Sequence, residues 1–427
     1  MIKLNKSHHE LFSSALKVTF VRVIGIVLQA ALILYLARVF SLENMGYFAL
    51  VYAVLSLVRM QGPLGLDQVS LRDISNALND GQIEKAQSIS TASLVFVLMA
   101  NTCFSLMGFA ALLLARQKLQ LSLVECALIS TAVLSFALNG TLMGQVRGFG
   151  KPLLAQIPDS IGLQLFFGLG LLTAQQFEPL PLSSTLLALT LASWAVTILY
   201  FIARRRTGIY ASTFPAWQEL WSLARKGGRI SQALILTHLS ARAPIFLSAI
   251  VLGPASTAIL EIATRFGTLT TVVTTSIAAT FSPRFAILAK QGAADDLRKT
   301  AYLAATLSLI PSLLILVGFA LVLPHLFGLI LPPAYGDALV PLLIIAGASA
   351  LNGALGPASN TLIMAGEPEP VRLLSFFRLI AIVTFSILLA APFGVVGIAW
   401  AILLATLLRD GGLTIIAHQK LGNLAQN

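Results

Sequence analysis

Long apolar runs recur along the whole 427-residue chain and restrict it to one class of structure. A membrane-spanning helix needs about 20 mostly apolar residues. Runs of that kind occur near residues 16–40, 46–66, 89–114, 119–144, 153–174, 182–203, 230–252, 257–281, 301–326, 339–364, 373–391 and 394–416. Charged residues make up only 11% of the chain, against about 25% in a soluble domain. We therefore predict an all-α polytopic membrane protein with about twelve transmembrane helices.

A polar stretch divides the predicted helices into two sets of six. We expect an N-terminal six-helix bundle at 1–203, a cytoplasmic linker at 204–229 and a C-terminal six-helix bundle at 230–427. The linker places Trp217, Leu220, Trp221 and Ala224 on one face of a helix. This pattern predicts a short interfacial helix on the inner leaflet. Packing of the tryptophans against the ends of the bundles is the alternative.

The two halves share a turn sequence. Gly150–Pro152 precedes the fifth apolar run, and Gly366–Pro368 precedes the eleventh. Internal repeats are common in transporters, where the substrate site lies between the repeats. The match, together with the six-plus-six count, favours a carrier over a channel or a membrane-anchored enzyme.

The basic residues fix the predicted orientation. With a cytoplasmic N-terminus, nineteen Lys and Arg residues fall in inside segments and three in outside segments. This bias predicts cytoplasmic termini. It also accounts for most of the net charge of +11, so we expect no nucleic-acid partner. The first apolar run is too long for the apolar core of a cleavable signal and is expected to be the first membrane helix.

Four arginines inside the predicted helices are candidate substrate-binding residues: Arg22, Arg59, Arg242 and Arg265. Ionisable residues at this depth are functional hypotheses by default. Arg242 lies nearest the middle of its helix, with His238 one turn before it and Pro244 two residues after it. A central arginine costs about 2.5–3.5 kcal/mol on insertion scales. Exposure of Arg242 to a central cavity would offset that cost, and a structural role is the alternative.

The remaining charges in these runs have simpler interpretations. Lys17 and Arg378 lie close enough to helix ends to snorkel, and snorkelling is the alternative for Arg22. Glu261 precedes Arg265 by four residues, so a structural ion pair is the alternative there. His238 and Glu261 are the candidate supporting or coupling residues. The acids assigned to the apolar spans are Glu125, Asp159 and Glu261. A cavity between the bundles would therefore be cationic and attract anions.

Patterns typical of catalysis or cofactor binding are missing from the sequence. The five histidines and two cysteines form no ligand spacing, and no Walker-type phosphate loop occurs. Paired acids in loops, such as Asp67 and Asp73, are expected to be solvated. We predict no catalytic residues, no metal site, no cofactor and no enzymatic activity.

Several segments resemble a known family. Residues 37–75 carry Glu43 and a Gly46–Tyr47 pair at the start of the second apolar run and a Gly65–Leu66 turn at its end. Residues 250–269, 276–288 and 360–368 continue the likeness. These segments resemble Wzx-like polysaccharide (O-antigen) flippases of the multidrug/oligosaccharidyl-lipid/polysaccharide exporter superfamily. Many members have an aspartate in the seventh helix, where this chain has Ala243 and Pro244 beside Arg242.

The resemblance implies a V-shaped pair of bundles around a cationic lumen in a bacterial cytoplasmic (inner) membrane. It also implies that undecaprenyl-diphosphate-linked oligosaccharide is flipped across that membrane for surface polysaccharide biosynthesis, alongside other polysaccharide-assembly membrane proteins. The alternative is a cation-coupled multidrug antiporter of the same superfamily, followed by a major-facilitator-type porter and a membrane-bound glycan enzyme. Arginine forks match phosphate oxygens well, which favours the flippase interpretation.

Overall fold

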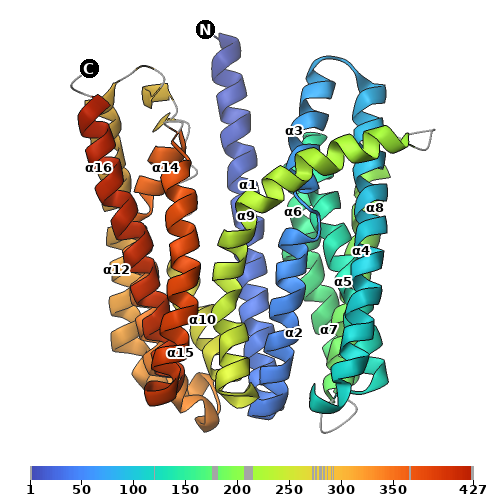
Figure 1. Cartoon of the computed structure of the whole chain (residues 1–427), viewed down its shortest axis with the longest axis vertical. Helices are drawn as coiled ribbons and strands as arrows, with labels where there is room; N and C mark the ends of the chain where they lie inside the picture. The colour runs from blue at the N-terminus through green and yellow to red at the C-terminus, as the bar shows by residue number, and fades with distance from the viewer. Residues whose placement is uncertain are drawn as a thin grey trace. The chain divides into compact units, whose positions relative to one another are not determined.

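Helices account for nearly all of the described structure (Figure 1). The computed structural model describes residues 2–119, 121–175, 181–205, 215–271, 293–364 and 367–424, with isolated positions between 271 and 293. The chain forms two compact units, one of residues 1–39 and 51–238 and the other of residues 40–50 and 239–427. Both α2 and α9 pass from one unit into the other along the chain.

The first unit contains α1 (Ile2–Val39), most of α2 (Leu42–Gln61), α3 (Leu66–Asn79), α4 (Ile83–Leu119), α5 (Leu123–Gly148), α6 (Pro152–Ile157), α7 (Leu163–Ala174), α8 (Leu182–Arg205) and the start of α9 (Trp217–Val251). A π-helical turn, Pro158–Gly162, joins α6 to α7. The second unit contains the rest of α9, α10 (Pro254–Gly267), α12 (Ala294–Ile330), α13 (Leu339–Leu355), α14 (Pro357–Met364), α15 (Glu369–Thr406) and α16 (Gly412–Leu424).

Ten described helical stretches are long and apolar enough to cross a membrane. They overlap eleven of the twelve predicted runs, because the stretch Glu369–Gln419 includes both 373–391 and 394–416. Gly394 separates two helices within that stretch with non-helical torsion angles. The remaining run, 257–281, extends outside the described residues, as do most of the family-like segment 276–288 and Gly366 of the second Gly-x-Pro turn. The prediction of an all-α polytopic membrane protein is confirmed.

The interfacial segment and the predicted seventh helix form one continuous helix, α9. The sequence GlyGly at 227–228 does not interrupt it. Gly227 allows close packing, since a Cβ there would lie 2.5 Å from the Leu64 carbonyl oxygen. Along the first turns, Leu220 is buried, whereas Trp217 and Trp221 are 62% and 55% exposed. The tryptophans therefore do not pack into a bundle end, and their exposure suits a membrane interface. The cytoplasmic linker at 204–229, as the boundary between two six-helix bundles, stays a prediction.

A stripe of glycines on α5 brings three helices of the first unit close together. Gly140, Gly144 and Gly148 recur every four residues on one face of α5. A Cβ at Gly140 would lie 2.5 Å from the Arg59 carbonyl oxygen, and one at Gly144 would lie 2.4 Å from that of Asp67. Small residues at such spacing let membrane helices approach closely. The stripe thus sets the position of α2 and α3 against α5.

Buried hydroxyl and amide groups connect the same helices. Gln145 donates to the carbonyl oxygen of Ser90 (2.8 Å) and to the hydroxyl of Ser93 (2.9 Å), joining α5 to α4. Asn139 donates to the carbonyl oxygen of Ser193 in α8 at 3.1 Å. Each such bond in a membrane helix bundle contributes on the order of 0.6 kcal/mol. Together they fix the rotation of α5 about its axis.

Replacing Gly394 with alanine is expected to destabilise the second unit by about 1–3 kcal/mol. Gly394 has φ 56° and ψ −134°, a conformation that alanine adopts only with strain. Space is available, since an added Cβ would meet no atom within 4 Å. Thermal unfolding of the purified protein in detergent measures the effect. Gly347→Ala is the control, because it also has free space but no positive φ; equal melting temperatures of the two variants would contradict the prediction.

Candidate functional site

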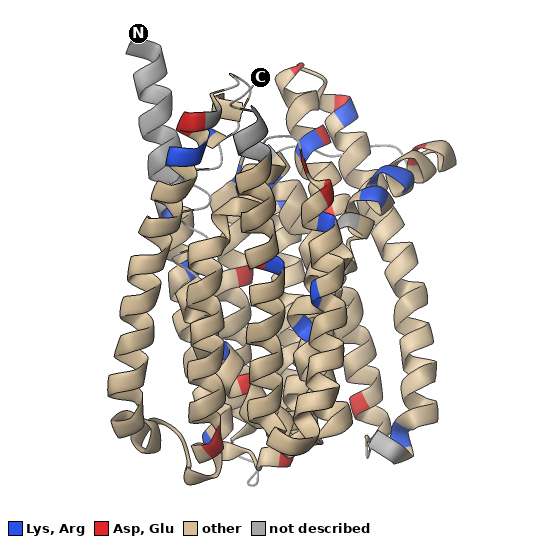
Figure 2. Cartoon of the chain, turned by 60° about the vertical axis from the view of Figure 1, so that its left-hand side comes forward, with Lys and Arg blue, Asp and Glu red and all other residues tan. Residues whose placement is uncertain are grey.

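The predicted site residue Arg59 forms an ion pair with Asp159 in the first unit. Arg59 lies in the last turn of α2, and Asp159 lies in the π-helical turn after α6. Both side chains are partly buried, with 29% and 11% of their surface exposed. Charged residues lie within the helices as well as at their ends (Figure 2). In this pair each charge compensates the other, whereas either charged group alone would be costly to place inside a membrane helix.

Proline placement explains the turn that presents Asp159. Pro152 begins α6, and Pro158 begins the π-helical turn. Because proline lacks the backbone N–H that an α-helix needs, the helix locally widens there. Helix α1 packs directly against the turn: a Cβ on Gly25 would lie 2.5 Å from the Ser160 carbonyl oxygen. Wide turns of this kind are frequent at functional sites.

A third arginine, Arg147, belongs to the same region. It lies in the last turn of α5, and its Nη2 donates to Oε1 of Gln156 at 2.9 Å. The charges of Arg22, Arg59 and Asp159 all act on Arg147. We call Arg22, Arg59 and Arg147 the arginine cluster. It combines three guanidinium groups with one carboxylate, which leaves two positive charges in excess.

Arg22 is the exposed member of the arginine cluster. It lies on α1 one turn before Gly25, the residue that packs on the π-helical turn. No ion pair of Arg22 occurs within the described part of the chain. The predicted residues Arg22 and Arg59 are thus brought into one region of the first unit, and Arg22 is accessible to a ligand.

His238, a predicted supporting residue, joins α9 to α2 within the first unit. Nδ1 of His238 and Nε2 of Gln61 lie 2.6 Å apart. Ser231 donates to the other end of the same amide, at Oε1 of Gln61, over 2.9 Å. His238 is thus hydrogen-bonded to the neutral amide of Gln61, which Ser231 holds at its other end. Any coupling role of His238 stays a prediction.

The predicted site residues of the second unit are Arg242, Arg265 and Glu261. Arg265 donates from Nε to Oε1 of Glu261 at 2.5 Å, one turn apart on α10. Glu261 is almost fully buried, and its side chain is 3% exposed. The alternative expected from the four-residue spacing, a structural ion pair, is therefore present. Arg242 is half-buried on α9 and has polar or electrostatic interactions of its own.

The second unit contains another buried carboxylate, Asp410. It is not one of the three acids that we expect in the apolar runs. Its side chain is 1% exposed and accepts a bond from Arg409 at 2.5 Å. Asn352 of α13 donates to the other carboxylate oxygen at 2.7 Å. Asp410 thus ties α13 to the π-helical turn Leu407–Gly411. Glu125, by contrast, forms a capping box with Ser122 at the start of α5 and is structural.

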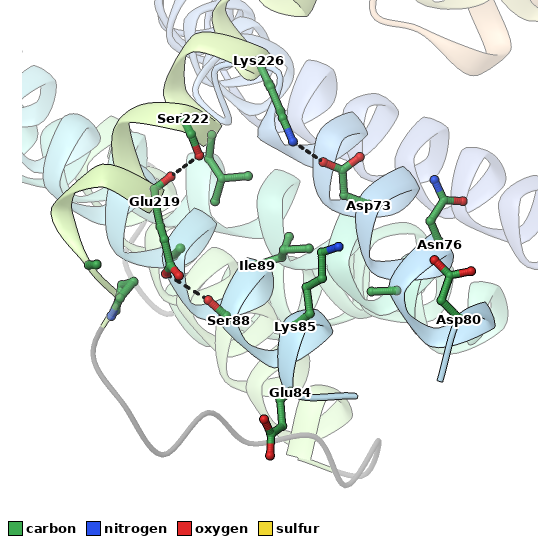
Figure 3. Close-up of a pocket in the computed structure, with 15 residues that line it drawn as sticks. Asp73, Asn76, Asp80, Glu84, Lys85, Ser88, Ile89, Glu219, Ser222 and Lys226 are labelled. Atoms are coloured by element: carbon green, nitrogen blue, oxygen red, sulfur yellow. Dashed lines mark hydrogen bonds and ion pairs between the residues drawn. The ribbon is translucent and has the colours of Figure 1, made fainter. Parts of the chain in front are cut away.

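A polar pocket of about 910 Å³ opens where α3, α4 and the start of α9 meet (Figure 3). Two contacts cross it: Lys226 donates to Asp73 at 3.2 Å, and Ser88 donates to Glu219 at 3.0 Å. They tether the amphipathic start of α9 to α3 and α4. Arg72 also pairs with Asp73 at 2.8 Å. Asp73, expected to be merely solvated, therefore has a structural role.

Comparisons with known proteins identify the fold. No family model matches the chain, and no curated protein matches it by sequence. An inward-facing structure of a multidrug resistance MATE family transporter of the MOP superfamily is similar over 96% of this chain and 99% of its own, with 14% identity and a TM-score of 0.79. An outward-facing structure of such a transporter is similar over 96% of this chain and 96% of its own, with 15% identity and a TM-score of 0.69.

A third similar structure is a MOP superfamily transporter from Pyrococcus furiosus, described as having a binding pocket of reversed polarity that suggests a different function. The likeness covers 97% of this chain and 96% of that one, with 14% identity and a TM-score of 0.67. The chain therefore has the fold of MATE transporters. This agrees with the superfamily expected from the sequence at the level of fold, and the Wzx-like assignment stays a prediction.

Proposed function

We propose that this protein is a membrane transporter and that its substrate is an anionic, lipid-linked molecule. The observation that carries the proposal is the arginine cluster, in which Arg59 pairs with Asp159 and Arg147 interacts electrostatically with both and with Arg22. Arginine is the residue best suited to bind phosphate oxygens in pairs. A diphosphate group is also the part of a lipid-linked precursor least able to enter hydrocarbon, so cations along its route lower that barrier.

The substrate that fits this chemistry best is undecaprenyl-diphosphate-linked oligosaccharide, flipped from the inner to the outer leaflet of a bacterial cytoplasmic membrane. Arg22, Arg59, Arg242 and Arg265 are proposed to contact the headgroup during transport, with Arg147 as an additional member. The product would supply the assembly of a surface polysaccharide by other membrane proteins. Both termini are proposed to lie in the cytoplasm.

Multidrug antiport is the second candidate, and the structural neighbours favour it over a flippase. Two of the structures described above are multidrug resistance transporters. An antiporter of cations needs carboxylates that can bind a proton or a cation. Three carboxylates in the described helices are instead occupied, because Asp159 pairs with Arg59, Glu261 with Arg265, and Asp410 with Arg409. The partly buried Asp67 accepts a hydrogen bond from Gln68. The internal charges therefore favour an anionic substrate.

Depletion of the protein in its native host tests the two candidates together. For a flippase, we expect diphosphate-linked oligosaccharide to accumulate on the cytoplasmic side and the surface glycan to decrease, both measured after lipid extraction. Arg242→Ala should reproduce the defect at normal protein levels. Unchanged precursors and glycan together with increased sensitivity to cationic drugs would instead support the antiporter.

A further inference from the structure

A small apolar cavity in the second unit is not explained by transport. It has a volume of about 200 Å³ and lies between α12, α14 and α16. Alanine side chains form much of its wall, among them Ala301, Ala305 and Ala358. Pockets for drug-sized ligands measure about 300–1,000 Å³. This cavity is therefore suited to a narrow apolar group, such as part of one acyl chain.

Three polar side chains lie at the edge of the cavity. Nη2 of Arg298 is 3.5 Å from Nε2 of His418, and the Tyr302 hydroxyl is 3.4 Å from Nδ1 of the same ring. The Arg298 guanidinium also lies 5.8 Å from the centre of the Tyr302 ring. Within the described residues, no acidic residue lines the cavity and Arg298 has no ion pair. The edge thus offers one fixed positive charge with further groups able to donate hydrogen bonds.

The cavity lies beside a surface that suits lipid. Large apolar side chains next to it are half exposed or more, including Leu303 at 50%, Ile310 at 53% and Ile415 at 61%. Arg298 and Tyr302 lie in the first turns of α12, which begins at Ala294 and continues as a long apolar helix. Arginine and tyrosine at the end of such a helix are typical of the headgroup level of a bilayer.

We propose that this cavity binds an anionic phospholipid, with one acyl chain against the alanines and the phosphate beside Arg298. The single guanidinium matches the single negative charge of a phosphodiester better than the higher charge of a diphosphate. The arginine cluster belongs to the first unit and the cavity to the second, so the lipid site is separate from the residues proposed to contact the transported substrate.

Native mass spectrometry of the full-length protein, titrated with phosphatidylglycerol or phosphatidylcholine in detergent, tests the proposal. We expect one phosphatidylglycerol to be retained preferentially. Arg298→Gln should weaken its binding about fivefold, the value of one basic residue at a lipid surface. Ala305→Leu should weaken it as well, because leucine fills the cavity. Lys299→Gln removes the same charge from the neighbouring, exposed position and should leave binding unchanged.

Four results would overturn the proposal. These are equal retention of the two lipids, equal effects of Arg298→Gln and Lys299→Gln, no effect of Ala305→Leu, or displacement of phosphatidylglycerol by an equal amount of polyprenyl diphosphate. The last result would assign the cavity to the transported lipid. Melting temperatures measured without added lipid identify any variant that fails to fold. Arg298→Gln, which alters only the edge, keeps the test decisive if Ala305→Leu is unstable.

Discussion

Arg22→Gln is expected to weaken binding of a diphosphate lipid by about 10–100-fold, because a hydrogen bond to a charged group contributes about 1.5–3 kcal/mol. Arg22 is exposed on α1 and has no ion pair within the described residues, so folding should be unaffected. Binding of polyprenyl diphosphate to the purified protein, and surface glycan in cells, measure the effect. The control is Arg116→Gln, which removes an exposed arginine near the end of α4. Equal binding by the two variants would contradict a substrate role for Arg22.

Variants of the Arg59–Asp159 pair can distinguish an effect on folding from an effect on transport. Asp159→Asn leaves the partly buried Arg59 without its carboxylate and should destabilise the first unit by up to about 3–5 kcal/mol. The double variant Arg59→Gln with Asp159→Asn removes both charges and should recover most of the stability. It should nevertheless transport poorly, because a guanidinium of the cluster is gone. Normal transport by a stable double variant would make Arg59 a structural residue only.

The apolar helices could be predicted from the sequence because their signal is local. A run of about 20 apolar residues indicates a membrane helix wherever it lies in the chain. The four-residue spacing of Glu261 and Arg265 likewise predicts the ion pair that the structure contains. The same reasoning separates the interfacial segment from the seventh run at 230–252, because a polar stretch lies between the apolar runs. Gly227 instead gives room to the Leu64 carbonyl of a distant helix end, which no local pattern reports.

The composition of the arginine cluster could not be predicted for a related reason. Arg147 follows the fourth apolar run, 119–144, and therefore counts among the inside charges. Its position near Arg59 depends on how α5 packs against α2, which follows from the glycine stripe on α5. Asp159 was placed near a helix end, and its pairing with Arg59 requires the π-helical turn. Both the position of Arg147 and the partner of Asp159 depend on contacts between segments that are distant in the sequence.

Gly46→Ala is expected to destabilise the protein by more than about 3 kcal/mol, at or above the upper end of ordinary overpacking. An added Cβ would lie 1.8 Å from the carbonyl oxygen of Pro254 and 2.8 Å from its Cα. Both are backbone atoms at the start of α10, so no side-chain rotation relieves the clash. The start of α2 and α10 belong to the same unit, and separating them would remove contacts within that unit.

Thermal unfolding of Gly46→Ala in detergent measures this effect, with Gly318→Ala as the matched control. Gly318 lies inside α12, and a Cβ there meets nothing within 4 Å. Alanine should therefore stabilise that helix by about 0.5–1 kcal/mol. Opposite shifts of the melting temperature in the two variants would show that Gly46 is required for close approach of α2 and α10. A Gly46→Ala protein as stable as the original would contradict this close approach of α2 and α10.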